Sequence, residues 1–316
     1  MLCEVNALGN FFVTWAVMMF MGLLIVGIMS GALFWKYFVN ATYETWVTKT
    51  NPRYPTATMV RSEILQTCKG IVTATIAPAL SLYLTQRNMS QAYCGVGELG
   101  WGYLIASFFV TMIASDFWEF YYHRLGHTTQ VGWNQHKYHH VFYNPSPFAV
   151  IADEYIDQFM RSLPLLVFPL IAPVNMDMMF AQFGLVFYGY GVYLHWGHEL
   201  SFPDAHHPWI NTSFQHYCHH AKSINKRPYH TGFMFKIWDQ LFGSMYTGDC
   251  FCSKCCYEKG ERTVDKFKQV VMEDYTPLLS ARFWIHGAEK ADSSALSEPD
   301  VRLKELEKPV SAKKSN

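Results

Sequence analysis

The sequence FFVTWAVMMFMGLLIVGIMSGALFW, residues 11–35, contains no charged residue. Its 25 positions exceed the roughly 20 helical residues that cross the hydrocarbon core of a membrane. Two further uncharged runs, residues 70–86 and 99–115, are shorter and carry aromatic residues. The three runs predict three membrane-spanning helices.

Residues 162–198 predict a membrane segment of another kind. This stretch carries one formal charge, Asp177, and three prolines, Pro164, Pro169 and Pro173. Proline interrupts a helix because it lacks the backbone N–H. We therefore expect a hairpin that enters the membrane and turns back near residues 173–177. The predicted fold class is an all-α, multi-pass membrane protein with about four transmembrane or hairpin segments and a cytoplasmic histidine-rich helical cap.

Loop charges predict the orientation of these segments. Residues 36–68 contain four basic residues, Lys36, Lys49, Arg53 and Arg61, whereas the loop of residues 87–98 contains a single arginine. Cytoplasmic loops carry the excess of Lys and Arg, so we expect the histidine-rich end and the C-terminus to be cytoplasmic. The sequon at Asn88 is then luminal, and the sequons at Asn40 and Asn211 are not.

Composition excludes some functions. Charged residues make up 16% of the chain, against roughly 25% in soluble domains. Lys plus Arg equals Asp plus Glu at 25 each, so no basic excess exists to hold nucleic acid. The 14 histidines are the unusual feature.

Ten histidines fall in four tight groups. The groups are His123 and His127, then His136, His139 and His140, then His195 and His198, then His216, His219 and His220. Neutral imidazole binds Zn, Cu, Fe and Ni, and residues four apart share a helix face. Ten imidazoles are too many for one tetrahedral ion, so we expect two ions with four to five imidazoles each. His206, His207 and His286 are interpreted as interfacial or capping residues, and His230 stays open.

Two carboxylates precede the first histidine pair on one helical face. Asp116, Glu119, His123 and His127 are spaced three, four and four residues apart. Metal-bound imidazoles usually donate their second N–H to a carboxylate or a carbonyl, which makes Asp116 and Glu119 candidate partners of the ligands. A purely structural role, with each carboxylate satisfied by a neighbouring helix or by Arg124, is equally open.

The ligand set favours redox chemistry. The HExxH signature of zinc hydrolases is absent from the sequence, whereas iron suits imidazole ligands and can activate O₂. Since the histidines follow membrane segments directly, we expect a lipid substrate that enters from the bilayer. A membrane electron carrier with bis-histidine haem is an alternative, although it needs only two axial histidines per haem.

Four motifs carry a family resemblance. HRLGH (123–127), HKYHH (136–140), HYCHH (216–220) and WDQLFG (238–243) resemble the signature of the fatty acid hydroxylase or sterol desaturase superfamily of membrane non-haem di-iron enzymes. The resemblance covers about residues 100–246. It implies an endoplasmic reticulum enzyme with two Fe ions that uses O₂ and electrons from NAD(P)H, delivered by cytochrome b5 and its reductase. It also implies that the clustered histidines, His198 included, are metal ligands.

Two branches of that superfamily share features with this chain. PSPFA (145–149) and LHWG (194–197) are similar to the sterol 5-desaturase pattern, whereas ADEY (152–155) is similar to the 4-methylsterol oxidase pattern. The resemblance implies a sterol substrate and a place in sterol biosynthesis, and leaves hydroxylation and desaturation open. A fatty acyl, alkylglycerol or terpenoid substrate is the alternative.

The domain prediction has four parts. They are an N-terminal transmembrane region (1–98), a di-iron domain (99–248), a cytoplasmic extension (249–288) and a mobile tail (289–316). The extension contains Cys250, Cys252, Cys255 and Cys256, for which a zinc or cluster site, acylation and incidental reduced thiols are the alternatives. The tail ends with Lys313 and Lys314 at positions that resemble a dilysine retrieval signal of the endoplasmic reticulum.

Overall fold

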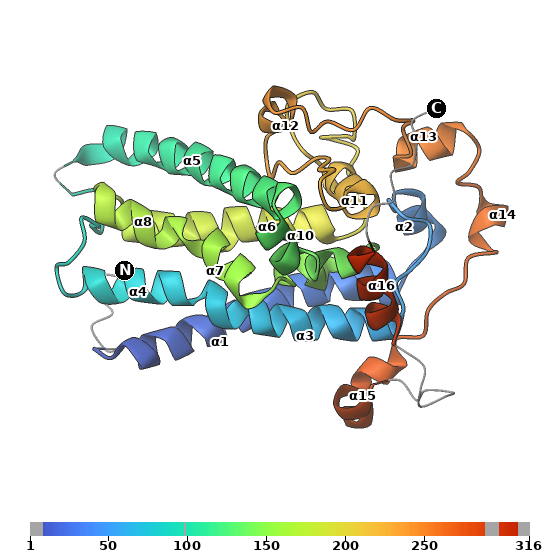
Figure 1. Cartoon of the computed structure of the whole chain (residues 1–316), viewed down its shortest axis with the longest axis horizontal. Coiled ribbons are helices and arrows are strands. Elements are labelled where there is room, and N and C mark those ends of the chain that lie inside the picture. The colour runs from blue at the N-terminus through green and yellow to red at the C-terminus, as the bar shows by residue number, and fades with distance from the viewer. Residues whose placement is uncertain (1–8, 98, 288–296, 309–316) are drawn as a thin grey trace.

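The computed structural model describes residues 9–97, 99–287 and 297–308. Over these residues the regular structure is helical, and β pairing is limited to isolated bridges. Long helices lie along one another in an elongated bundle, and the shorter helices gather toward one end (Figure 1). The predicted all-α fold class is confirmed.

Three helical segments among the described residues are long and apolar enough to cross a membrane, Phe11–Val39, Ala57–Thr85 and Gly100–Thr128. The first is helix α1 (Phe11–Phe34) with the π-helical turn η3 (Trp35–Val39). The second consists of α3 (Ala57–Ala74) and α4 (Ile76–Thr85), which meet at Thr75. The third is α5 (Gly100–Thr128), which ends with the first histidine pair.

The second segment begins 13 residues earlier than residue 70, where the sequence prediction placed it. The prediction ended the apolar run at charged residue types, but the side chain of Glu63 is buried, and its carboxyl group accepts a hydrogen bond from the Ser146 amide at 3.0 Å. At Gly70, an added Cβ would lie 2.3 Å from the carbonyl oxygen of Ile151. Close packing against protein therefore lets the helix continue through a charged stretch.

The predicted hairpin is present as a reversal of the chain. Helices α7 (Tyr155–Ser162) and α8 (Pro164–Ile171) lead into it, and α9 (Met176–Ala181), η6 (Gln182–Phe187) and α10 (Tyr188–His195) lead back. Asn175 starts the return because its side chain accepts from the Met178 amide at 2.8 Å. Leu82 of α4, Leu165 of α8 and Met179 of α9 pack in one buried cluster, which holds both arms against the bundle.

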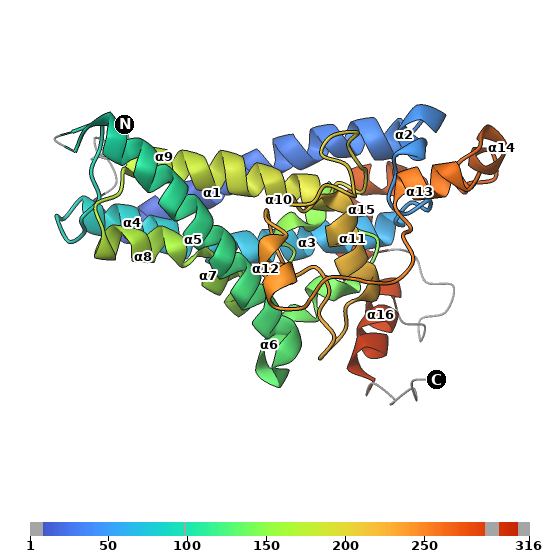
Figure 2. The same ribbon diagram turned by 90° about the horizontal axis from the view of Figure 1, so that it is seen from above.

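Short helices gather at the end of the bundle where α5 ends (Figure 2). The short elements there are α2 (Tyr43–Val47), α6 (Gln130–His136), η4 (His139–Val141), η5 (Pro147–Ile151), α11 (Ser213–Lys222) and α12 (Ile237–Leu241). The extension follows with α13 (Ser253–Glu258), α14 (Val264–Phe267), η7 (Thr276–Leu279) and α15 (Ala281–His286).

Part of the predicted mobile tail is an ordered helix. Helix α16 (Glu298–Glu307) buries Leu306 in a cluster with Met59 and Trp133. Lys137 also pairs with Glu307 at 2.7 Å. The sequence did not predict this helix because its composition is polar and few of its residues are apolar ones that pack against the bundle. Lys313 and Lys314 lie outside the described residues.

Candidate metal centre

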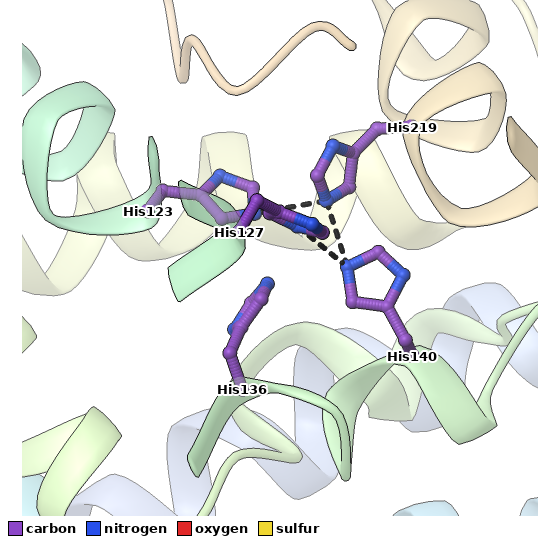
Figure 3. Close-up of side chains that lie close together, drawn as sticks. All are labelled: His123, His127, His136, His140 and His219. Carbon is purple, nitrogen blue, oxygen red and sulfur yellow. Dashed lines mark hydrogen bonds between the residues drawn. The ribbon is translucent and has the colours of Figure 1, made fainter. Parts of the chain in front are cut away.

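Five histidines from three parts of the chain form one group, with ligand nitrogens that all lie within 4.8 Å of one another. We call it the five-histidine group. Figure 3 shows the five rings turned toward a common centre. The members are His123 and His127 of α5, His136 of α6, His140 of η4 and His219 of α11.

The hydrogen bonds of this group fix which nitrogens are free. His123 Nδ1 donates to the Thr231 carbonyl at 3.0 Å, and His219 Nδ1 donates to the Tyr229 carbonyl at 2.6 Å. Carbonyl oxygens only accept, so both Nδ1 atoms carry the proton. The two Nε2 atoms therefore carry a lone pair and no proton, yet they lie 2.9 Å apart. A cation between them removes the repulsion that this contact implies.

The nitrogen separations also match a coordination shell. Metal–nitrogen bonds of about 2.1 Å at right angles place two nitrogens about 3.0 Å apart. The Nε2 atom of His140 lies 3.0 Å from that of His127 and 3.0 Å from that of His219. His136 Nε2 is buried and has no hydrogen-bond partner. The five-histidine group could therefore hold one metal ion, because its donor atoms are of a suitable type, are suitably spaced and have free lone pairs.

A second group contains four buried histidines, His139, His195, His216 and His220. We call it the four-histidine group. His195 Nδ1 donates to the Gly191 carbonyl at 2.8 Å, which leaves its Nε2 free. That Nε2 lies 2.8 Å from His216 Nε2 and 3.3 Å from His139 Nε2. The two groups thus contain five and four imidazoles, within the range of four to five per ion that the sequence predicts.

Two carboxylates contact the rings of these groups. Asp157 Oδ2 accepts from His136 Nδ1 at 2.9 Å, and Asp153 Oδ1 lies 3.3 Å from His139 Nδ1. Arg161 donates to Asp157 at 3.3 Å and to Glu119 at 2.6 Å. Asp157 therefore orients the His136 imidazole through a hydrogen bond, as outer partners of metal ligands do, whereas Asp153 lies beside His139 without a hydrogen bond to it.

Burial keeps these imidazoles neutral. It is the largest cause of pKa values well below 6.5 at His136, His140, His216, His219 and His220, and neighbouring histidines lower the same pKa values further. Neutral imidazole is the form that binds a metal ion. The environment of both groups therefore favours the ligating state.

Local sequence explains how the histidine pairs face one another. Thr129 ends α5 and caps α6, with its hydroxyl accepting from the Gly132 amide at 3.0 Å. An added Cβ at Gly132 would lie 2.3 Å from the Leu125 carbonyl oxygen, so only glycine permits this tight turn. Thr212 and Gln215 form a capping box at the start of α11. These devices fix the starts of α6 and α11.

The WDQLFG motif supports the five-histidine group through the backbone of residues 231–232. Asp239 accepts hydrogen bonds from the Thr231 and Gly232 amides at 2.9 Å each. Because the Thr231 carbonyl accepts from His123, Asp239 positions that ring through the backbone. The segment of residues 224–231 also supplies the carbonyls that accept from His127 and His219.

Three residues of the sequence prediction lie elsewhere. His198 is buried but belongs to neither group, and its Nδ1 donates to the Thr45 carbonyl at 3.0 Å. Asp116 accepts from the Met234 amide and the Trp238 indole at 2.6 and 2.7 Å. Glu119 pairs with Arg161 and contacts no histidine of the groups through a hydrogen bond. His230, left open by the sequence, accepts from the Tyr246 amide and lies outside both groups.

Three residues close to the histidine groups were not predicted from the sequence, namely Asp153, Asp157 and Arg161. Asp153 lies within the ADEY stretch, whose family resemblance was a usable signal. Asp157 and Arg161 are four residues apart on α7, so their pairing is visible in the sequence once α7 is known. Their contacts with His136 and Glu119 bridge 21 and 42 residues, and no local pattern indicates these contacts.

A cavity of about 450 Å³ joins the membrane segments to the histidines. Apolar side chains of α1 and of the hairpin line it, among them Met18, Ile25, Phe183 and Phe187. Its polar lining includes histidines of both groups, His123, His139, His195 and His216. Apolar pockets with a few convergent polar groups are the usual form of ligand sites, so this cavity is the candidate substrate site.

Residues 108–244 match the family model for fatty acid hydroxylase. Lathosterol oxidase of Rattus norvegicus is 31% identical over 188 residues, which is 58% of this chain and 60% of the relative. Lathosterol oxidase of Homo sapiens is 29% identical over 62% of this chain and 64% of the relative. Delta(7)-sterol 5(6)-desaturase of Aspergillus fumigatus is 30% identical over 66% and 58%. The match thus spans about three fifths of these relatives, and no solved structure gives a significant match.

Proposed function

We propose that the chain, of which residues 108–244 match the fatty acid hydroxylase family model, is a member of the fatty acid hydroxylase and sterol desaturase superfamily and an O₂-dependent oxidoreductase that desaturates a sterol in sterol biosynthesis. The names of the relatives support a sterol substrate and favour desaturation over hydroxylation.

The five-histidine group and the four-histidine group would each hold one iron ion, giving a di-iron centre. Iron bound there would supply the change of oxidation state that activates O₂ and removes hydrogen from an unactivated C–H bond. The ligands are the five and four histidines named above, without His198. The closest Nε2 pairs, at 2.8–3.1 Å, leave no room for a haem ring between them, which disfavours the haem alternative.

The protein's own groups position the ligands and exclude water. Asp157 fixes the ring of His136, and backbone carbonyls fix the rings of His123, His195 and His219. Each such bond leaves the opposite nitrogen pointing inward with a free lone pair. The apolar lining of the cavity keeps bulk water from the centre, which protects a reactive oxidant from side reactions.

The observation that carries the proposal is the cavity itself. A sterol is a rigid apolar molecule, and the cavity is lined by apolar side chains of α1, α4, η6 and α10 before it reaches the histidines. A bound sterol would therefore present one carbon of its ring system to the metal centre. Arg161 and Glu119 also line the cavity as a pair and would give a sterol hydroxyl hydrogen-bonding partners.

Electrons would come from NAD(P)H through cytochrome b5 and its reductase, in the membrane of the endoplasmic reticulum. The loop charges support an orientation with the histidine end and the C-terminus toward the cytoplasm, where a soluble cytochrome domain has access.

Expression of the full chain in a host that lacks sterol 5-desaturase, followed by mass spectrometry of its sterols, tests the proposal. We expect a sterol with one additional double bond, absent in a His219→Ala variant and retained in a His286→Ala variant, since His286 is exposed at the end of α15. An unchanged sterol profile together with a new hydroxylated fatty acyl chain, alkylglycerol or terpenoid would contradict the sterol assignment.

A further inference from the structure

A second set of metal-binding residue types lies outside the two histidine groups. Cys250, Cys252 and Cys255 of the extension meet His206, and their ligand atoms all lie within 4.8 Å of one another. The sequence alone predicts an interfacial or capping role for His206, because His206 lies 44 residues before Cys250 and only the fold brings them together. We call these four residues the cysteine–histidine cluster.

The separations in this cluster match a tetrahedral zinc site. Zinc–sulfur bonds of about 2.3 Å and zinc–nitrogen bonds of about 2.1 Å, at the tetrahedral angle, place sulfur and nitrogen about 3.6 Å apart. The Sγ atoms of Cys250 and Cys255 lie 3.5 and 3.6 Å from His206 Nε2. One imidazole nitrogen thus faces two sulfurs at the separation that a shared ion would set.

The third sulfur is held in place by the backbone. Cys252 is fully buried, and its Sγ accepts from the Cys255 amide at 3.4 Å at the start of α13. Two cysteines separated by two residues are a common ligand spacing of structural zinc sites, and an amide bond to one sulfur is the outer support that such ligands have. Cys256 lies outside the cluster, with its Sγ donating to the Phe251 carbonyl at 3.5 Å.

We propose that Cys250, Cys252, Cys255 and His206 form a structural zinc site. Three thiolates and one imidazole complete four-coordination, so the site has no open position for substrate and differs in kind from the all-imidazole groups. All three cysteines are free thiols in the structure. A reducing cytoplasm, the compartment that the loop charges indicate for this end, favours metal binding over disulfides.

Zinc at this position would join the extension to the helix that carries the last histidine triplet. Ala205, next to His206, accepts from the Gln215 side chain of α11 at 2.7 Å. On the other side, the Ser253 amide of α13 donates to Glu199 at 2.8 Å. A metal crosslink between these two segments would attach the extension to the loop that precedes α11.

Zinc release by a thiol-blocking mercurial tests the proposal on the full chain purified in detergent with zinc and iron in the medium. The mercurial displaces metal from thiolates and leaves histidine-only sites intact. A colorimetric zinc indicator should therefore report the release of about one equivalent of zinc per chain. X-ray absorption at the zinc edge should then fit three sulfur atoms and one nitrogen.

Variants at exposed or half-buried positions separate binding from folding. Cys250→Ser and His206→Ala should each lose the releasable zinc, whereas the neighbouring Cys256→Ser and His207→Ala should retain it. Iron content should stay unchanged in all four variants, so a failure here is distinct from a failure of the proposed function. Absence of mercurial-releasable zinc in the wild type, its persistence in the His206→Ala and Cys250→Ser variants, or a disulfide or thioester at these cysteines by mass spectrometry would overturn the proposal.

Discussion

Replacing Asp157 with asparagine tests how the five-histidine group is oriented. Asp157 accepts from His136 Nδ1 at 2.9 Å in a buried site, and this bond directs His136 Nε2 toward the other ligands. Asparagine has the same shape and can still accept a hydrogen bond, so the substitution removes the charge with little loss of packing.

The expected loss follows from the hydrogen bond. Hydrogen bonds to charged groups contribute roughly 1.5–3 kcal/mol and neutral ones roughly 0.5–1.5 kcal/mol. The midpoints differ by about 1.25 kcal/mol, or roughly eightfold in an equilibrium constant. Changes in outer partners of metal ligands cost about 10–100-fold in metal affinity. We therefore expect Asp157→Asn to weaken binding of one of the two ions at least about tenfold.

The assay is titration of the iron-loaded full chain with a chelator, with retained iron measured by mass spectrometry. Asp157→Asn should release one equivalent at lower chelator concentration than the wild type, and the second equivalent at a nearly unchanged concentration. Glu119→Gln is the matched comparison, since Glu119 contacts Arg161 but no histidine of the group through a hydrogen bond. An Asp157→Asn protein that releases both ions like the wild type, or a Glu119→Gln protein with the larger loss, would refute the reasoning.

Three further outcomes are expected. His219→Ala should lower the affinity for iron by more than the roughly 100-fold that the loss of an outer partner costs. His198→Gln should retain iron, because His198 lies apart from both groups; equal losses of iron in the two variants would contradict the ligand assignment. Glycosidase treatment should shift the gel mobility of the wild type but not of the Asn88→Gln variant. Asn40 is also exposed, and the Asn40→Gln variant should behave like the wild type; a shift that depends on Asn40 would indicate the opposite topology. Iron retention and thermal stability should fall as the pH drops below 6.5, because burial lowers the pKa of His136 well below that value, so the unfolded chain binds more protons than the folded one; a pH-independent stability between pH 7 and pH 5 would count against the buried neutral imidazoles.

Local spacing was enough to predict most of the candidate ligands. His123 and His127 share a face of α5 because four residues complete about one helical turn, and His216 and His220 share a face of α11 for the same reason. Uncharged length predicted α1 and α5 equally directly. These features depend on residues within one helix, and sequence spacing describes them completely.

Features that depend on a change of chain direction were not predictable. His198 follows His195 by three residues, but α10 ends at His195 and Gly197, with a φ of 78°, turns the chain away. Asp116 has the helical spacing of a ligand partner, yet its carboxylate faces Trp238 and the Met234 amide. The partners in both cases come from distant segments, whose positions only the packed fold determines.

Iron analysis and X-ray absorption of the purified, iron-reconstituted full chain test the central claim most directly. The account predicts two equivalents of iron per chain, with an iron-edge spectrum that fits imidazole nitrogen and no sulfur. A single equivalent, sulfur in the iron shell, or a haem Soret band in place of non-haem iron would contradict it.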